Sequence, residues 1–114
     1  MIRRLSIIGA FVVALAWPTA APAQDVEKGK QVYANSNPKC KMCHSIAGDG
    51  NAKGSLDNAG KLSAADIKAW IRTPKEMTAK AKAERKPPMV AYGADKISDA
   101  DLDALVAYLS SLKK

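Results

Sequence analysis

The chain has 114 residues and a formal net charge of +7, with 25% charged and 5% aromatic residues, which fits one small domain. It contains two cysteines and one histidine, and this inventory excludes a structural zinc site, which usually needs four sulfur or nitrogen ligands. The basic charge does not indicate nucleic-acid binding, because no aromatic residues are interleaved with the basic ones.

The N-terminal segment has the three parts of a secretory signal peptide. Arg3 and Arg4 form a basic start, residues 7–17 form an apolar run, and residues 21–23 read Ala-Pro-Ala, which matches an A-x-A cleavage site. The apolar run is shorter than a comfortable membrane span. We therefore predict that residues 1–23 are a cleaved signal peptide, with an uncleaved membrane anchor as the alternative.

Residues 24–114 are predicted to form the one mature domain. No later stretch resembles a transmembrane helix, so no stable membrane insertion is expected after cleavage. A signal of this type predicts a soluble protein exported to the periplasm. A chain this short buries a modest fraction of its surface and often needs a covalent cross-link, a metal or a bound cofactor to stabilise it.

The first helix of the mature chain is predicted to run from Asp25 to about Asn35. The Asp25 side chain suits an N-cap because its carboxylate accepts from free N–H groups at the positive helix end. Gly29 inside this helix costs about 1 kcal/mol relative to Ala, so we expect another helix to approach it closely. Small and apolar residues share one face at helical spacing: Val26, Gly29, Val32 and Tyr33.

Residues 40–44 read Cys-Lys-Met-Cys-His, a pattern that predicts covalent attachment of a c-type haem. Two thiols one turn apart can add to the two vinyl groups of a porphyrin, and His44 can then supply the proximal imidazole. A short disulfide or a thiol–disulfide redox pair would also use two cysteines. The redox pair expects a β-α-β context, whereas the flanks here are predicted to be helical. The glycine-rich loop over residues 48–55 is expected to wrap the proximal side of the haem.

Three further helices are predicted, over residues 63–73, 74–82 and 98–112. Ser63 and Ser98 are each followed three residues later by an acid, as in a capping pattern. The last helix has apolar residues at the spacing of a buried face: Leu102, Leu105, Val106, Leu109 and Leu112. No segment shows a sustained period-two strand pattern, so the predicted fold class is all-α.

The second axial ligand decides what the iron can do, because two protein ligands favour electron transfer over ligand binding. His44 is the single histidine, so the second strong ligand must be a methionine, with Lys, Tyr or water as weaker options. Met77 lies on the apolar side of a predicted helix, where methionine is usually core filling. Met89 follows Pro87-Pro88, which would hold its thioether rigidly. Met89 is favoured and Met77 remains the alternative.

The sequence resembles the class I (mitochondrial-like) bacterial cytochromes c over residues 25–112. The resemblance is carried by the motif at residues 40–44 together with a few further matches: Gly29 with Tyr33, Leu105 with Tyr108, residues 70–74, and Pro88-Met89. It implies an all-α cytochrome c fold in which the N- and C-terminal helices cross each other around one haem c, bound covalently through Cys40 and Cys43.

The resemblance also implies roles for particular residues. His44 and Met89 would be the axial ligands, Leu56 and Ile71 would pack on the haem, and Trp70 would lie near the ligand or a propionate. The chain departs from the family at residue 55, where Ser replaces a common Pro in the loop whose backbone carbonyl often orients the axial histidine. The spacing from Pro74 to Met89 is also long for the family, which keeps Met77 as an alternative.

The predicted function is therefore single-electron transfer between redox enzymes by a monomer or by a subunit of a small complex. The alternatives are the electron-accepting subunit of a periplasmic oxidoreductase, or a gas- or peroxide-binding haem protein with a weak sixth ligand. The sequence offers no distal His or acid suited to peroxide chemistry, which favours the carrier. Basic residues either ring the haem edge and steer docking to acidic redox partners or simply solvate the surface: Lys39, Lys41, Lys53, Lys80, Lys82, Arg85 and Lys86.

Overall fold

The computed structural model of the protein describes Gly9 and residues 23–83 and 87–114. Its α-helices are α1 (Ala23–Asn35), α2 (Ala64–Arg72), α3 (Pro74–Ala81) and α4 (Asp99–Ser110). Short 3₁₀ turns lie between them, namely η1 (Cys40–Met42), η2 (Ala52–Gly54) and η3 (Ala59–Lys61). The predominance of helix confirms the predicted fold class.

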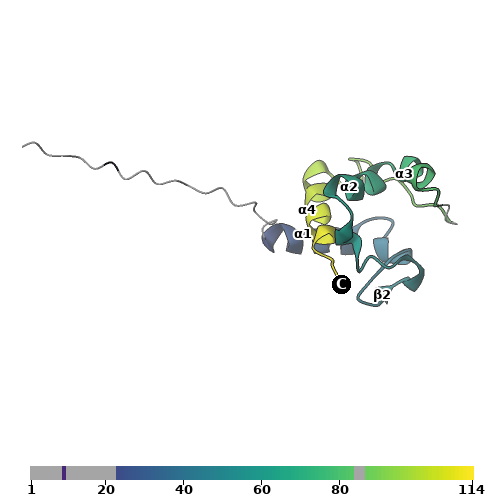
Figure 1. Cartoon of the computed structure of the whole chain (residues 1–114), viewed down its shortest axis with the longest axis horizontal. Helices are drawn as coiled ribbons and strands as arrows, with labels where there is room; N and C mark the ends of the chain where they lie inside the picture. The colour runs from purple at the N-terminus through teal and green to yellow at the C-terminus, as the bar shows by residue number, and fades with distance from the viewer. Residues whose placement is uncertain (1–8, 10–22, 84–86) are drawn as a thin grey trace, which may run out of the picture.

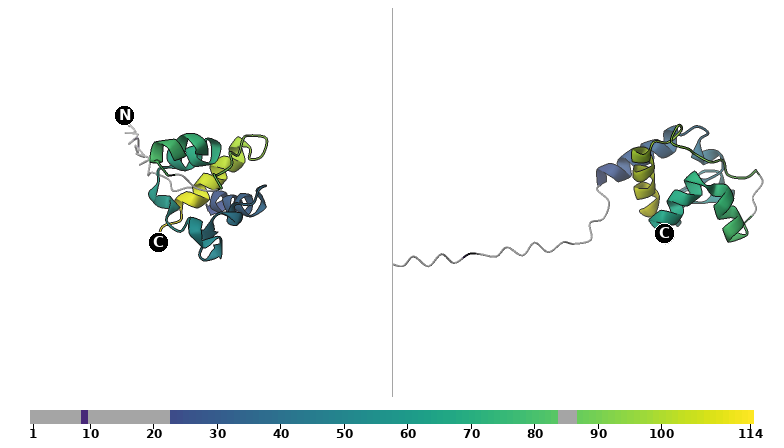
Figure 2. Two further views of the ribbon diagram at one scale, coloured as in Figure 1. Left: turned by 90° about the vertical axis from the view of Figure 1, so that its right-hand side faces the viewer. Right: turned by 90° about the horizontal axis from the view of Figure 1, so that it is seen from above.

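The crossing of α1 and α4 is the most extensive contact between two elements in the described chain, and both views of Figure 2 show the two helices side by side. A Cβ atom on Gly29 would lie 2.1 Å from the Ala104 carbonyl oxygen and 2.6 Å from the Tyr108 Cβ, so only glycine allows this approach. The expected partner of Gly29 is thus confirmed as the last helix, with Tyr108 on the crossing. Leu105 instead lies in the core, 2% exposed.

The core lies between α4, α2 and the segment that connects α3 to α4. Its buried residues are Ile67, Ile71, Tyr92, Ile97, Leu102, Leu105, Tyr108 and Leu109. Leu102 and Leu105 are the largest fully buried side chains of the described residues, as expected from the apolar spacing of α4. Figure 1 shows the crossing of α1 and α4 at one end of the fold and α3 at the other.

Serine caps begin two of the helices as predicted. The Ser63 Oγ accepts from the Asp66 N–H at 3.1 Å, and the Ser98 Oγ accepts from the Asp101 N–H at 3.2 Å. Helix α1 begins two residues earlier than expected, and α4 ends at Ser110 rather than near Leu112. Beyond this end, the Gly60 N–H donates to the Leu112 carbonyl at 2.8 Å, which joins the chain after α4 to η3.

A two-stranded hairpin was missed by the sequence analysis. Strand β1 (Ser45–Ile46) pairs antiparallel with β2 (Asp49–Gly50), and the two residues between them have positive φ, 51° at Ala47 and 84° at Gly48. That is the backbone of a tight hairpin turn. Strands of two residues are too short to show a period-two pattern, so the hydrophobic pattern gave no signal.

Among the described residues, no helix combines the length and the apolar character needed to cross a membrane. The predicted signal peptide falls outside the described residues, except for Gly9 and Ala23. Its cleavage therefore stays a prediction.

Candidate functional site

The Cys-x-x-Cys-His motif begins at Cys40, shortly after α1 ends at Asn35, and Ser36 positions it. The buried Ser36 hydroxyl lies 3.1 Å from the Cys40 sulfur and accepts from the Cys40 N–H at 3.3 Å. The motif then turns through η1, and the Cys43 and His44 N–H groups both donate to the Cys40 carbonyl. Neither thiol is in a disulfide, and Cys43 is exposed while Cys40 is half-buried. Both sulfurs are thus presented within one turn of chain, as double attachment requires.

The environment of Cys40 argues against a thiol–disulfide redox pair. Burial raises the pKa of the Cys40 thiol above its ordinary value. Reactive Cys-x-x-Cys pairs depend instead on a lowered pKa that yields a thiolate near neutral pH. The half-buried, neutral sulfur fits a group that packs against an apolar ring.

The imidazole of His44 is oriented by a backbone carbonyl. Its Nδ1 lies 2.9 Å from the Gly54 oxygen, and because a carbonyl can only accept, Nδ1 must carry the proton. Nε2 is then the lone-pair nitrogen of the neutral ring, which is the arrangement of a metal-ligating histidine. The carbonyl belongs to residue 54, so Ser55 in place of the family's common Pro does not remove this interaction.

Gly54 is needed for this contact. It is buried, and a Cβ atom there would lie 2.1 Å from the Cys43 carbonyl oxygen and 2.9 Å from the His44 Nδ1. The chain passes so close to the histidine ring that a side chain cannot fit. The glycine-rich loop therefore lies against the motif, and its predicted place on the proximal side of a haem stays a prediction.

Asn51, which the sequence analysis did not single out, closes the loop around the motif. Its N–H lies 3.0 Å from the His44 carbonyl and 3.2 Å from that of Lys41, and its side-chain amide donates to the Met42 carbonyl at 3.3 Å. Its Oδ1 also caps η2 by accepting from the Lys53 N–H at 3.0 Å. The sequence could have indicated this role, because an Asn in a glycine-rich stretch commonly forms hydrogen bonds with the nearby backbone in turns.

A large cavity lies beside α3. Its volume is about 1260 Å³, above the range of about 300–1,000 Å³ typical of small-molecule sites, so it has room for a bulky planar group. The residues that line it come from α3 with its flanks and from the stretch before Tyr92, and they are Thr73, Pro74, Lys75, Glu76, Thr78, Ala79, Lys82, Pro88, Met89 and Ala91. Met89 is among these residues, while Met77 is not.

The other residues predicted to contact the haem occupy different positions. Ile71 lies in the core, 5% exposed, and Leu56 and Met89 are partly buried against that core. Trp70 is partly exposed and is not among the described residues packed on the core cluster. The structure thus brings Ile71, Leu56 and Met89 to one core, and Trp70 is not among the described residues of that core.

Tyr92 was not singled out in the sequence, and the structure gives it an anchoring position. It is 5% exposed, and its hydroxyl donates to the Pro38 carbonyl at 2.5 Å. Its N–H donates to the Ile71 carbonyl at 3.0 Å. Burial raises the pKa of Tyr92 to about 12, so the hydroxyl keeps its proton at neutral pH.

Arg72 is the third residue, after Asn51 and Tyr92, whose position was not predicted from the sequence. Its guanidinium donates to the Tyr92 carbonyl at 2.9 Å, to the Ile97 carbonyl at 2.7 Å and to the Asp99 carboxylate at 2.9 Å. The acceptors lie within or just after residues 87–98, a stretch without helix or strand that we call the Met89 segment. The fork of donors on Arg suits such a bridge, but nothing in sequence spacing predicts it.

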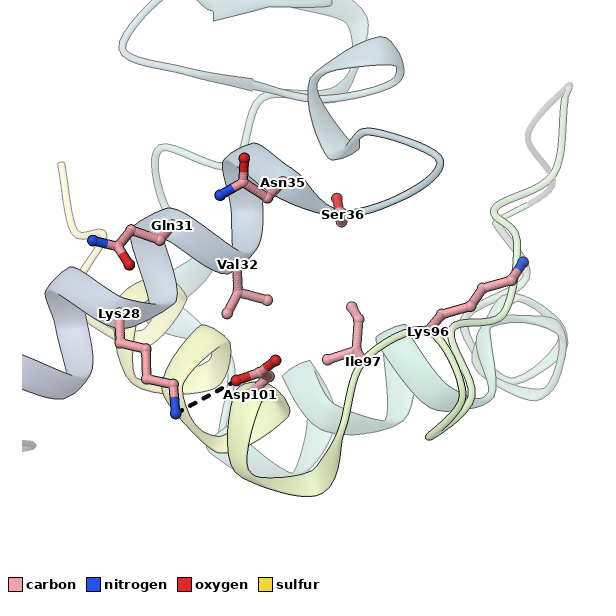
Figure 3. Close-up of a pocket in the computed structure, with 8 residues that line it drawn as sticks. All are labelled: Lys28, Gln31, Val32, Asn35, Ser36, Lys96, Ile97 and Asp101. Carbon is pink, nitrogen blue, oxygen red and sulfur yellow. Dashed lines mark ion pairs between the residues drawn. The ribbon is translucent and has the colours of Figure 1, made fainter.

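A second, smaller hollow lies between α1 and the chain that leads into α4, with a volume of about 240 Å³. Figure 3 shows Lys28 and Asp101 on its rim, 3.4 Å apart as an ion pair. Both side chains are about half exposed, so the pair contributes little. No residue that was predicted to hold or contact the haem lines this hollow.

The basic residues considered for partner docking are exposed where the structure describes them. This holds for Lys39, Lys41, Lys53, Lys80 and Lys82. Arg85 and Lys86 lie outside the described residues.

The residues present fit a covalently attached haem. They supply two adjacent thiols, a histidine with Nε2 as its lone-pair nitrogen, and a large cavity that Met89 lines. Met89 packs against the core and lines the cavity, whereas none of residues 40–44 is among the described residues of the core cluster or of the cavity lining.

Comparison with known proteins agrees with this geometry. The family model described as "Cytochrome c" matches residues 26–113. A cytochrome c oxidase subunit 2 of Alkalihalophilus pseudofirmus is 34% identical over 96 residues, which cover 75% of this chain and 25% of that protein. The chain thus spans about a quarter of the length of this relative. No solved structure matches. Proteins of the matched family bind haem c covalently and transfer electrons, and the chain belongs to the cytochrome c family.

Proposed function

We propose that the protein is a periplasmic carrier that passes single electrons between redox enzymes, with His44 and Met89 as axial ligands of its one haem c. The observation that carries this proposal is the position of Met89, partly buried against the core and lining the large cavity. A second strong protein ligand favours electron transfer over the binding of gases or peroxide.

His44 is prepared for coordination before any metal is present. The hydrogen bond from Nδ1 to the Gly54 oxygen, 2.9 Å long, fixes the tautomer and makes Nε2 a better donor. Asn51 bonds the surrounding backbone and Gly54 approaches the ring closely, so the chain itself would keep the ring in this orientation when it holds the iron.

Met89 supplies a soft, neutral sulfur. A thioether favours ferrous over ferric iron, so His/Met ligation raises the reduction potential. Haem c supplies the iron whose oxidation state changes by one electron. Pro87 and Pro88 limit the backbone freedom of the chain before Met89, which reduces the entropy lost when the sulfur is held in place.

Export rests on the sequence of residues 1–23, which has the basic, apolar and A-x-A parts of a signal peptide. Haem attachment through two thiols also suits a compartment outside the cytoplasm, where cysteines are oxidised unless they are otherwise used. Mass spectrometry of the exported protein tests both points, since it reports removal of residues 1–23 and the added mass of one haem.

A second candidate function is that of a subunit in a redox complex. The observation that favours it is the 34% identity with a cytochrome c oxidase subunit 2. A freestanding carrier purifies from its native host as a monomer, whereas a subunit co-purifies with larger chains. Size-exclusion chromatography of the tagged protein from that host separates the two.

The ligand assignment is tested by Met89→Ala, with Met77→Ala as the matched control. We expect Met89→Ala to retain its haem, to bind carbon monoxide in the ferrous state and to have a lower reduction potential. Met77 does not line the cavity, so its variant should behave as the unmodified protein does. If Met77→Ala instead opens the iron to carbon monoxide, the assignment of Met89 is wrong.

A further inference from the structure

The Met89 segment has no helix or strand of its own to fix Met89. A thioether is a weak ligand whose hold on iron depends on how well the protein positions it. Contacts with the rest of the fold must therefore hold this segment in place. Among the described residues, two side chains join this segment to other parts of the fold. One is Arg72, at the end of α2, and the other is the phenol of Tyr92.

The first anchor joins the Met89 segment to the attachment motif. Tyr92 lies three residues after Met89, and its hydroxyl donates to the carbonyl of Pro38, two residues before Cys40. This hydrogen bond spans 54 residues of sequence. Because the phenol is 5% exposed, water does not readily replace the bond, and a buried acceptor that loses its donor is costly.

The second anchor joins the same segment to α2. The Arg72 guanidinium holds two carbonyls of the segment, those of Tyr92 and Ile97. Its ion pair with Asp99 involves a carboxylate that is 89% exposed, so the ion pair itself contributes little. The Arg72 side chain is 19% exposed, so its bonds to the two carbonyls are the better shielded part of this anchor.

We propose that Tyr92 and Arg72 are positioning residues that hold the Met89 thioether at the haem iron. Tyr92 sets the distance between the Met89 segment and the motif that carries Cys40, and Arg72 fixes the segment on α2. This inference rests on the proposed ligation by Met89. Loss of either anchor lets the segment move away as a unit, which leaves haem attachment intact and weakens the sixth ligand.

The test uses the haem-loaded protein with Tyr92→Phe, which removes one hydroxyl. We expect the share of ferrous iron open to carbon monoxide to rise by about two- to tenfold, the factor that corresponds to one lost hydrogen bond, and the reduction potential to fall. The haem content per chain should not change. Arg72→Lys keeps the charge but loses the planar set of N–H donors. It should likewise raise the share of ferrous iron open to carbon monoxide and lower the reduction potential.

Tyr33→Phe is the matched control. Within the described residues, the buried Tyr33 hydroxyl has no hydrogen-bond partner, so its removal should leave the carbon monoxide binding and the potential unchanged. If Tyr92→Phe and Arg72→Lys lower only the thermal unfolding midpoint, with both iron readouts as in the control, the two residues are merely structural and the inference is overturned.

Met89→Ala is measured in the same series to separate this inference from the proposed function. If Met89→Ala opens the iron while Tyr92→Phe and Arg72→Lys behave as the control does, the ligand assignment stands and the positioning role is wrong. If Met89→Ala itself leaves the iron closed, the proposed ligation fails and the positioning role fails with it.

Discussion

The two sides of the site are built by different means. The attachment segment, residues 36–56, is held mainly by short-range hydrogen bonds, such as that from His44 to Gly54, which spans 10 residues. The Met89 segment is held by bonds that span 20, 25 and 54 residues, from Arg72 to Tyr92, from Arg72 to Ile97 and from Tyr92 to Pro38. The first side depends on local sequence, whereas the second depends on the whole fold.

This contrast suits the two tasks. Cys40 and Cys43 on the histidine side would carry the covalent bonds, and local contacts suit a part of the site that must stay fixed. With Met89 as the proposed sixth ligand, the methionine side would depend on contacts from distant parts of the chain, which form once those parts have packed. Long-range contacts are the more costly to assemble, because they close longer loops.

The largest expected effect follows from removal of both attachment cysteines. Cys40→Ala/Cys43→Ala should yield a chain that cannot hold its folded core, since so small a domain depends on the covalently attached haem for its stability. Far-UV circular dichroism should show loss of most helix. Met42→Ala is the control, because Met42 lies between the cysteines and is 67% exposed. A native-like spectrum from the double variant would mean that the protein core does not depend on the haem.

A smaller effect is expected from Gly54→Ala, which probes the histidine side alone. The new Cβ would lie 2.1 Å from the Cys43 carbonyl oxygen, so the backbone must shift, and we expect a loss of about 1–3 kcal/mol in the free energy of unfolding. Ser55→Ala changes the neighbouring exposed residue and should remain within about 0.5 kcal/mol. Denaturant titration measures both. Equal stability of the two variants would show that the close approach of Gly54 can relax.

The smallest effect is expected at the α1–α4 crossing, away from both ligands. Burial raises the pKa of Tyr33 to about 12 from an ordinary value of 10.0, so the folded state holds the proton more tightly than the unfolded state. This contribution to stability is complete below pH 10 and is lost as the pH rises toward 12. Between pH 10 and pH 12, Tyr33→Phe should therefore lose less of its free energy of unfolding than the unmodified protein does. At neutral pH, the free energies of unfolding of the two proteins should be equal.

Denaturant titrations between pH 8 and pH 12 measure this difference, with Tyr92 retained in both proteins. Parallel losses of stability in the two proteins would contradict the assignment to Tyr33. In that case other groups, such as Tyr92, whose pKa is also raised to about 12 by burial, would account for the loss at high pH.

Much of the histidine side could be predicted from the sequence. The motif at residues 40–44 specifies the attachment chemistry by residue type and spacing, and Gly29 indicated a close helix approach that Ala104 and Tyr108 supply. The serine caps of α2 and α4 were also predicted and are present. The motif and the caps depend on neighbours within a few residues, which sequence patterns record directly, whereas the glycine at position 29 indicates that a helix comes close without identifying which one.

The positions of the two methionines depend on the tertiary structure. The sequence left Met77 and Met89 as alternatives because both are flexible thioethers, and the structure places Met89, but not Met77, among the residues that line the large cavity, which supports the proposed ligation. Tyr92 and Arg72 could not be assigned from spacing, because their acceptors are backbone carbonyls, which every residue carries. The sequence alone predicted the cofactor and its attachment, whereas only the packing of distant segments determined which residues lie near one another, because the chain records the identity of each side chain but not its proximity to others.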